Sequence, residues 1–363
     1  MTAAVVRYPG LDLIRMAAGL ALMIAHAAFW LAPFGLPDTL WLLLGHIGVE
    51  AFLVCSAFLF SLTLLETAAP VIARSWVRAL LRLWPLYALL VLVNLAFVGA
   101  LEQPWPSLPA YLSLTQNLAW PHPPFFGEAW IVAAAAMVFI VVPPICHGLR
   151  GCGFVAGCAW LIAGLAATIA LRATLVALGD PTFDLGVRKI LIMRLDMPLY
   201  AILLAWCWTH RRETLLRYRA MLAVIGAIAL LATAFSHLWS PLDDDTPMRI
   251  ALLTACDLGW ALLMPCACAV TIAARPARGL AILAGSAYAG LLTHMTLLRL
   301  GLWLGVPMQA TGRAQGLAML ALYVALATLV ALLVRYGLDR PLLGWRDRLL
   351  PDTAQGLPPV EER

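Results

Sequence analysis

The chain has 363 residues, of which 63% are hydrophobic and 12% charged, with a net charge of +5. Soluble domains carry about 25% charged residues, so this composition and a mean hydropathy of +0.90 exclude an ordinary soluble fold. An all-α, polytopic membrane protein is expected, because helices satisfy all their backbone hydrogen bonds inside a bilayer. The positive charge lies mainly between apolar runs, which indicates membrane topology and argues against a nucleic-acid partner.

Ten apolar runs are each long enough to cross about 30 Å of hydrocarbon as a helix. We expect these helices at residues 12–34, 44–66, 83–101, 127–147, 154–178, 190–208, 220–237, 249–272, 280–303 and 313–335. Arginine gathers in the connectors after even-numbered runs, whereas proline and acid gather after odd-numbered runs. Because arginine-rich loops stay in the cytosol, both termini are expected there. Residues 1–335 would form the membrane domain and residues 336–363 a short cytosolic tail.

The first run contains Arg15 and His26, eleven residues apart. Eleven residues make about three helical turns, so the two side chains share one helix face about 16 Å apart. Ionisable groups are costly inside a membrane and usually functional there. The alternative is that Arg15 extends to the cytosolic surface while His26 only hydrogen-bonds a neighbouring helix.

Later runs place further ionisable residues towards the outer side of the membrane. Counted at 1.5 Å per residue, Glu50 on the second helix lies within one turn of His26 in depth. Glu128, Asp196, Asp257 and His294 fall in the same outer half or at its mouth. Their convergence predicts a polar cavity, although each residue taken alone is also compatible with a structural hydrogen bond between helices.

One stretch runs against the charge rule. The segment GVRKILIMRLD places Arg188, Lys189 and Arg194 on the expected outer side. These charges must therefore face water, a lumen or a substrate path.

The distribution of charge suits transfer of an activated group across the membrane. Arg15 and Arg82 lie near the cytosolic surface, where an anionic donor would meet them first. A neutral histidine beside a carboxylate, as expected for His26 and Glu50, can deprotonate a hydroxyl at pH 7. The same residues also suit a proton-coupled transporter, and the physics of the chain does not separate the two.

The eight cysteines indicate neither a metal site nor disulfides. Seven lie in or at the ends of apolar runs without histidines at ligand spacing, and Cys152 lies in a loop expected in the cytosol. We expect no metal.

Five segments occur in a characteristic order. They are GLDLIRMAAGLALMIAHA with Arg15 and His26, GHIGVEAFLVCSAFLFSLTL with Glu50, VRALLRLWPLY with Arg82 and Tyr87, MRLDMPLYAILLAW with Arg194 and Asp196, and GSAYAGLLTHMTLLRL with His294. In order and spacing they resemble the acyltransferase 3 family of integral-membrane O-acyltransferases, over nearly the whole chain. Two departures are that Ala79 stands where the family has a second arginine, and that FFGEAW keeps Glu128 but lacks the tryptophan before it.

The resemblance implies roles for particular residues. His26 would be the catalytic histidine, which either activates the acceptor hydroxyl directly or carries the acyl group briefly. Glu50 would orient His26 or stabilise its imidazolium form. Acyl-coenzyme A would be bound by four residues: Arg15, Arg78 in place of the missing arginine, Arg82 and Tyr87. The acceptor or the cavity wall would involve Glu128, Trp130, Arg194, Asp196, Asp257 and His294.

The resemblance also implies a substrate pair and a location. Residues 1–335 would be an acyltransferase 3-like domain in a bacterial inner membrane. It would move acetyl from cytosolic acetyl-coenzyme A to a sugar hydroxyl of an exported or cell-envelope polysaccharide, or of its lipid-linked precursor. Peptidoglycan, a lipid or a small hydroxylated metabolite are alternative acceptors. A homodimer, or partner proteins of polysaccharide synthesis, stay open.

Overall fold

The computed structural model describes residues 7–36, 38–67, 72–100, 106–236, 243 and 245–350. This part of the chain is helical and contains no strand. The first half contains α1 (Pro9–His26), the 3₁₀ helix η1 (Ala28–Phe34), α2 (Asp38–Glu66), α3 (Ile72–Ala100), α4 (Leu108–Leu112), η2 (Pro124–Phe126), α5 (Ala129–Leu149) and α6 (Phe154–Gly179). The second half contains the short π-helix η3 (Phe183–Arg188), η4 (Leu191–Arg194), α7 (Asp196–Arg217), α8 (Arg219–Ala234), α9 (Thr246–Cys268), α10 (Ala274–Gly285), α11 (Ala287–Trp303), α12 (Arg313–Val334), η6 (Arg335–Asp339) and α13 (Arg340–Leu349).

All ten expected runs contain helix, but they do not all form one straight span. Within the described residues, eight helices are long and apolar enough to cross a membrane, or nine if the bent pair α10 and α11 counts as one. The chain bends by 54° between these two helices. The seventh run, residues 220–237, corresponds to α8, which is apolar but has only 16 residues. Several long apolar helices make this a multi-pass membrane protein.

Local sequence explains several helix ends. Pro9 occupies the first turn of α1, where its missing N–H is not needed. Asp245 caps α9 by accepting a hydrogen bond from the backbone N–H of Met248 at 3.0 Å. After α6 the backbone turns through Asp180 in the left-handed region, with φ of +42°.

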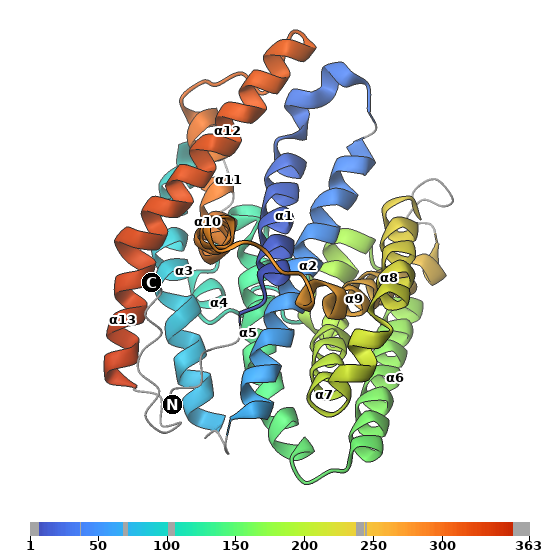
Figure 1. Cartoon of the computed structure of the whole chain (residues 1–363). Helices are drawn as coiled ribbons and strands as arrows, with labels where there is room; N and C mark the ends of the chain where they lie inside the picture. The colour runs from blue at the N-terminus through green and yellow to red at the C-terminus, as the bar shows by residue number, and fades with distance from the viewer. Residues whose placement is uncertain are drawn as a thin grey trace.

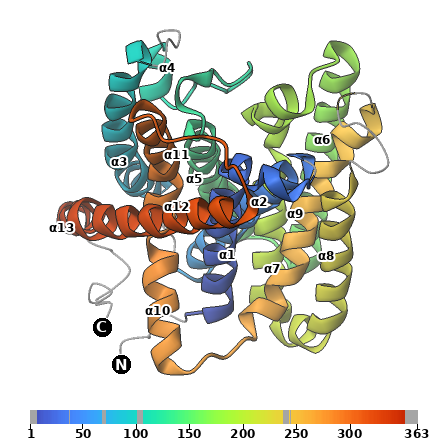
Figure 2. The same cartoon turned by 90° about the horizontal axis from the view of Figure 1, so that it is seen from above.

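The bundle is built around α1 and α2. These two helices pack against each other along their length, with α6 to α9 on one side and α3, α11, α12 and α13 on the other (Figures 1 and 2). α2 contacts α5, α7 and α9 as well, which makes it the central helix. α6 and α12 are largely exposed and lie at the periphery, where lipid would cover them.

Glycine permits the closest helix contacts. A Cβ added to Gly10 of α1 would lie 2.1 Å from the carbonyl oxygen of Ala267 in α9. A Cβ added to Gly316 of α12 would lie 2.1 Å from the carbonyl oxygen of Trp30 in η1. Small residues are the usual means of close helix approach in membranes.

Candidate functional site

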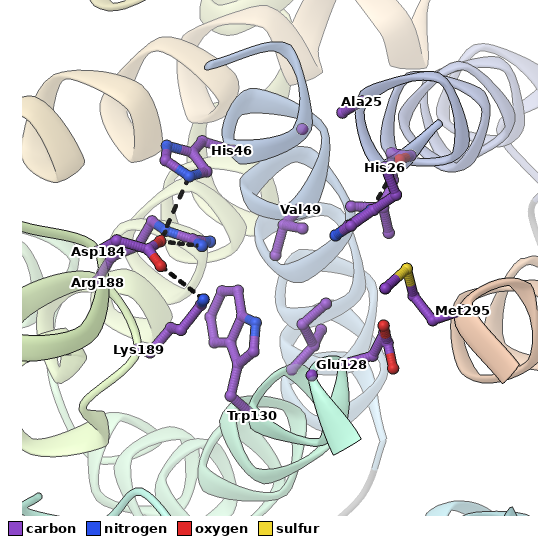
Figure 3. A pocket seen from close by; sticks show the side chains of 14 residues that line it. Ala25, His26, His46, Val49, Glu128, Trp130, Asp184, Arg188, Lys189 and Met295 are labelled. Atoms are coloured by element: carbon purple, nitrogen blue, oxygen red, sulfur yellow. Dashed lines mark hydrogen bonds and ion pairs between the residues drawn. The ribbon is translucent and has the colours of Figure 1, made fainter. Parts of the chain in front are cut away.

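A cavity of about 160 Å³ lies where the C-terminal end of α1 meets α2, the start of α5, the η3 segment and α11. Figure 3 shows two groups of polar side chains on opposite sides of it, with Val49 and Trp130 between them. One side carries His26 and Glu128, and the other carries His46, Asp184, Arg188 and Lys189. Of the ionisable residues expected to converge here, His26 and Glu128 line the cavity, whereas Glu50, Asp196, Asp257 and His294 are not among its lining residues.

His26 lies in the last turn of α1 and points into the cavity. Its Nδ1 lies 2.9 Å from the carbonyl oxygen of Leu22, one turn earlier on the same helix. A carbonyl only accepts, so this contact assigns the proton to Nδ1 and leaves the lone pair on Nε2. Nε2 is the ring atom that faces the cavity in Figure 3. His26 therefore presents a proton acceptor to any group bound there.

His294 of α11 supports the His26 ring from behind. Its Nδ1 lies 3.1 Å from the carbonyl oxygen of Gly290 and 3.0 Å from that of Leu291, so this nitrogen is also the protonated one. Its Nε2 lies 3.4 Å from Nδ1 of His26, so it shares the single Nδ1–H of His26 with the carbonyl oxygen of Leu22. His294 is buried and His26 is half-buried, and each ring has one nitrogen held by a backbone carbonyl.

The carboxylate next to His26 is that of Glu128. Glu128 directly precedes α5, is 2% exposed, and neither of its carboxylate oxygens has a hydrogen-bond partner in the described part of the chain. Burial raises the pKa of Glu128 to about 7, with the positive charge of Arg299 opposing this shift. One ligand atom each from His26, Glu128 and His294 lie within 4.8 Å of one another.

The same three residues have the chemistry of a metal-ligand set, since imidazole nitrogens and a carboxylate suit zinc. The contacts within the cluster are also those of a proton-transfer group, in which one nitrogen of each imidazole is held by a backbone carbonyl. The sequence analysis predicted no metal, and the distances among these three residues do not test that prediction.

The expectation that Glu50 orients His26 is wrong. Both carboxylate oxygens of Glu50 accept hydrogen bonds from Arg194, one from Nη1 at 2.9 Å and one from Nη2. Asp257 lies on the other side of the same guanidinium, 3.6 Å from Nη2. Glu50 has a depth similar to that of His26 but projects from α2 towards α7 and α9.

Like Glu50, Asp196 belongs to a buried ion pair rather than to the cavity. Arg172 of α6 donates to both of its carboxylate oxygens, at 3.0 Å and 2.7 Å. Arg172 is fully buried and also donates to the hydroxyl of Thr254 at 2.5 Å. The sequence analysis missed this arginine, although its position inside an apolar run was the available indication.

The other side of the cavity is a charged cluster centred on Asp184. This carboxylate accepts hydrogen bonds from Arg188 Nε at 2.8 Å and Nη2 at 2.5 Å, and from Lys189 Nζ at 2.6 Å. The Nε2 atom of His46 lies 3.5 Å from it. Although burial alone would raise it, the pKa of Asp184 is held well below its usual range by His46, Arg188 and Lys189.

Arg188 and Lys189 line the cavity. From the sequence we expected these charges to face water, a lumen or a substrate path. Trp130, expected at the acceptor site or cavity, also lines it and lies 4.6 Å beneath the Arg188 guanidinium. His46 and Asp184 were not predicted as site residues. His46 stands one turn before Glu50 in an apolar run, which was the signal that could have identified it.

The residues expected to bind the donor lie away from this cavity. Arg15 forms an ion pair with Asp12 in its own helix. Arg78 pairs with Asp347 of α13 at 3.0 Å. Arg82 is exposed, and its nearest charged neighbours include Arg346 and Asp339. Arginines from α1, α3 and the C-terminal helices thus gather in one region.

Tyr87 is not exposed to that region. It is completely buried, and its hydroxyl donates to the carbonyl oxygen of Tyr111 at 3.1 Å. Its ring is stacked near Phe126, with an interplanar angle of 10°. A direct donor contact from Tyr87 does not fit this arrangement, in which the side chain anchors α4 to α3.

No protein-family model, curated protein or solved structure matches this chain. The function therefore has to be argued from the site.

Proposed function

We propose that the chain is a membrane O-acyltransferase of the acyltransferase 3 type, with acetyl-coenzyme A as donor and a sugar hydroxyl of a cell-envelope or exported polysaccharide, or its lipid-linked precursor, as acceptor. It would lie in a bacterial inner membrane with ten spans and both termini in the cytosol. The single observation that supports this best is the Nε2 atom of His26, which faces the cavity while Nδ1 is held by a backbone carbonyl.

The proposed reaction needs one base and no covalent intermediate. Nε2 of His26 takes the proton of the acceptor hydroxyl, and the oxygen attacks the thioester carbonyl carbon. The C–S bond then breaks, and the leaving thiolate takes the proton back from Nε2 to give free coenzyme A. Glu128 and His294 stabilise the imidazolium between these two transfers, the role that Glu50 was expected to fill.

The arginine region supports the donor side of the proposal. Arg15 shares a helix with His26, about 16 Å away along the axis. Arg78 and Arg82 extend the same basic surface from α3. An anionic coenzyme held there would have to extend its acyl arm along α1 to reach His26.

The decisive experiment measures ester groups on envelope glycan from cells that carry each variant at matched membrane levels. His26→Ala should abolish ester formation without loss of the protein, because it removes the base of the proposed reaction. The control is His147→Ala, which changes an exposed histidine at the end of α5. Wild-type ester content with alanine at position 26 would reject the catalytic assignment.

A second function, proton-coupled transport, is favoured by one observation. Asp257 is fully buried, both of its carboxylate oxygens lack a hydrogen-bond partner in the described residues, and the Arg194–Glu50 pair lies beside it. Such intramembrane carboxylates often carry protons in transporters. Unchanged ester content in a strain without the gene would place this function first.

A further inference from the structure

The cavity carries more positive than negative charge on its Asp184 side. Arg188 and Lys189 contribute two positive charges, and Asp184 contributes one negative charge. His46 is buried. Across the cavity, Glu128 offsets the excess only in part at neutral pH, because its pKa is about 7.

Both cations keep hydrogen-bonding capacity for a bound group. Arg188 uses Nε and Nη2 on Asp184, while its Nη1 makes no hydrogen bond to the described part of the chain. Lys189 uses one of its three N–H donors on Asp184, and its side chain is 18% exposed. A buried positive charge without a full counter-charge is costly, so a bound anion would stabilise this side of the cavity.

The size of the cavity limits what can bind. At about 10 to 15 Å³ for each water-sized group, a volume of about 160 Å³ holds roughly the atoms of one monosaccharide. The cations and His26 lie on opposite sides of this same space (Figure 3). One sugar unit can therefore place an anionic group at Arg188 and a hydroxyl at His26 at the same time.

We infer that the acceptor is an acidic sugar unit, whose carboxylate or phosphate binds Arg188 and Lys189 while one of its hydroxyls lies at Nε2 of His26. This inference rests on the proposed function for the role of the hydroxyl, but the anion site can be tested without acyl transfer. Arg188 would bind the anion through Nη1 and Lys189 through its remaining N–H donors. Asp184 competes with the anion for both cations.

The test is calorimetric titration of the purified full-length protein in detergent with glucuronate, glucose 1-phosphate and glucose. The wild type should bind at least one of the two anionic sugars about tenfold or more tightly than glucose, as expected for a charge-assisted hydrogen bond. Preference for glucuronate would identify a carboxylate, and preference for glucose 1-phosphate a phosphate. Equal binding of glucose, or no measurable binding of either anion, would overturn the inference.

Two substitutions at the site should act in opposite directions. Lys189→Met keeps much of the side-chain length and should lose most of the preference for the anion. Asp184→Asn removes the competing charge and should tighten anion binding, whereas a purely structural carboxylate would weaken binding when changed. Arg278→Gln removes one positive charge from an exposed position in α10 and should leave affinity unchanged. Equal preference in the wild type and in Lys189→Met would contradict the site.

The same titration separates this inference from the proposed function. His26→Ala should retain anion binding while losing ester formation. Anion binding by a wild-type protein that forms no ester would retain the site and reject the acyltransferase. Ester formation on neutral and acidic sugars at equal KM would reject the site and retain the acyltransferase.

Discussion

Two buried carboxylates lie near the end of α1, and their surroundings give them different roles. Glu50 is neutralised by a guanidinium that binds both of its oxygens. Glu128 is equally buried, but its oxygens have no hydrogen-bond donor among the described residues. A carboxylate of the second kind holds its proton more strongly and can exchange it near pH 7. The partner of His26 is thus the less stabilised acid.

The raised pKa of Glu128 predicts a pH-dependent stability. Between its usual pKa of 4.5 and about 7, the folded protein binds this proton and the unfolded chain does not, so stability falls as pH rises. The loss is up to about 3 kcal/mol. Glu128→Gln cannot ionise and should have a higher Tm than the wild type at pH 8, but not at pH 4.5. Thermal unfolding in detergent at both values measures this.

His26, His294, Arg299 and Lys189 also face Glu128 or act on its charge, so the wild type can show other pH effects. The change of Tm with pH is therefore compared between Glu128→Gln and Glu50→Gln, because the second variant removes a paired carboxylate instead. A wild-type pH slope that survives in Glu128→Gln would contradict the assignment.

Arg82 provides a residue-scale test of the donor region. It is exposed on α3 beside other arginines, so it is available to a phosphate group. Arg82→Ala should weaken acyl-coenzyme A binding about tenfold or more, and Arg82→Lys should recover only part of it, because lysine cannot make the bidentate contact. Equilibrium binding of the donor to purified protein measures both. Unchanged affinity for acyl-coenzyme A in both variants would mean that the charge of Arg82 serves only to set the membrane topology.

At the scale of elements, the site depends on breaks in two helices. α1 ends at His26 and the chain continues as η1, while α10 and α11 meet at a bend of 54°. These two interruptions are joined by Tyr323 of α12, whose hydroxyl donates to the carbonyl oxygen of His294 at 3.3 Å and whose ring packs on Trp30 of η1. α12 therefore contacts α11, which carries His294, and η1, which follows the end of α1 at His26.

The contact between α12 and η1 should be sensitive to one methyl group. Gly316→Ala would place Cβ against the carbonyl oxygen of Trp30, at a separation that forces the backbones apart. We expect a loss of about 1–3 kcal/mol or more, seen as a lower Tm. Gly19→Ala in α1 is the matched control, because its Cβ would meet open space and alanine favours the helix. Equal Tm values for the two variants would contradict the close packing.

At the scale of the whole molecule, the arginine region and the cavity lie apart from each other. The basic surface of α3 and α13 lies towards one end, and the cavity at the end of α1 lies towards the other. The proposed topology of ten spans would require α8 to cross the membrane with 16 residues, which span about 24 Å.

Reporter fusions test this arrangement. Fusions after Arg150, Arg217 and Arg278 should report the cytosol, because these loops are rich in arginine. Fusions after Ser107 and Asp180 should report the outer side. Asp244, close to the start of α9, lies outside the described residues. An outer-side signal after Arg217 would show that α8 does not cross as expected.

Much of the architecture was predictable from the sequence because hydropathy is a local property. Each of the ten apolar runs contains helix in the structure, since any long apolar segment in lipid must satisfy its own backbone. The predictions were less accurate at helix breaks. A run such as 280–303 is continuous in hydropathy, yet the chain bends after Gly285. Hydropathy depends on residue type alone and does not report a change in chain direction.

The choice of His26 as a candidate could likewise be made from one helix, since spacing within a helix fixes which side chains share a face. Its partner could not. Depth along a helix follows from residue number, but the direction in which a side chain points also depends on how each helix is rotated against its neighbours. That rotation is set by packing over the whole bundle, and it directs Glu50 towards Arg194, places Glu128 beside His26, and brings His46 and Asp184 to the opposite side of the cavity.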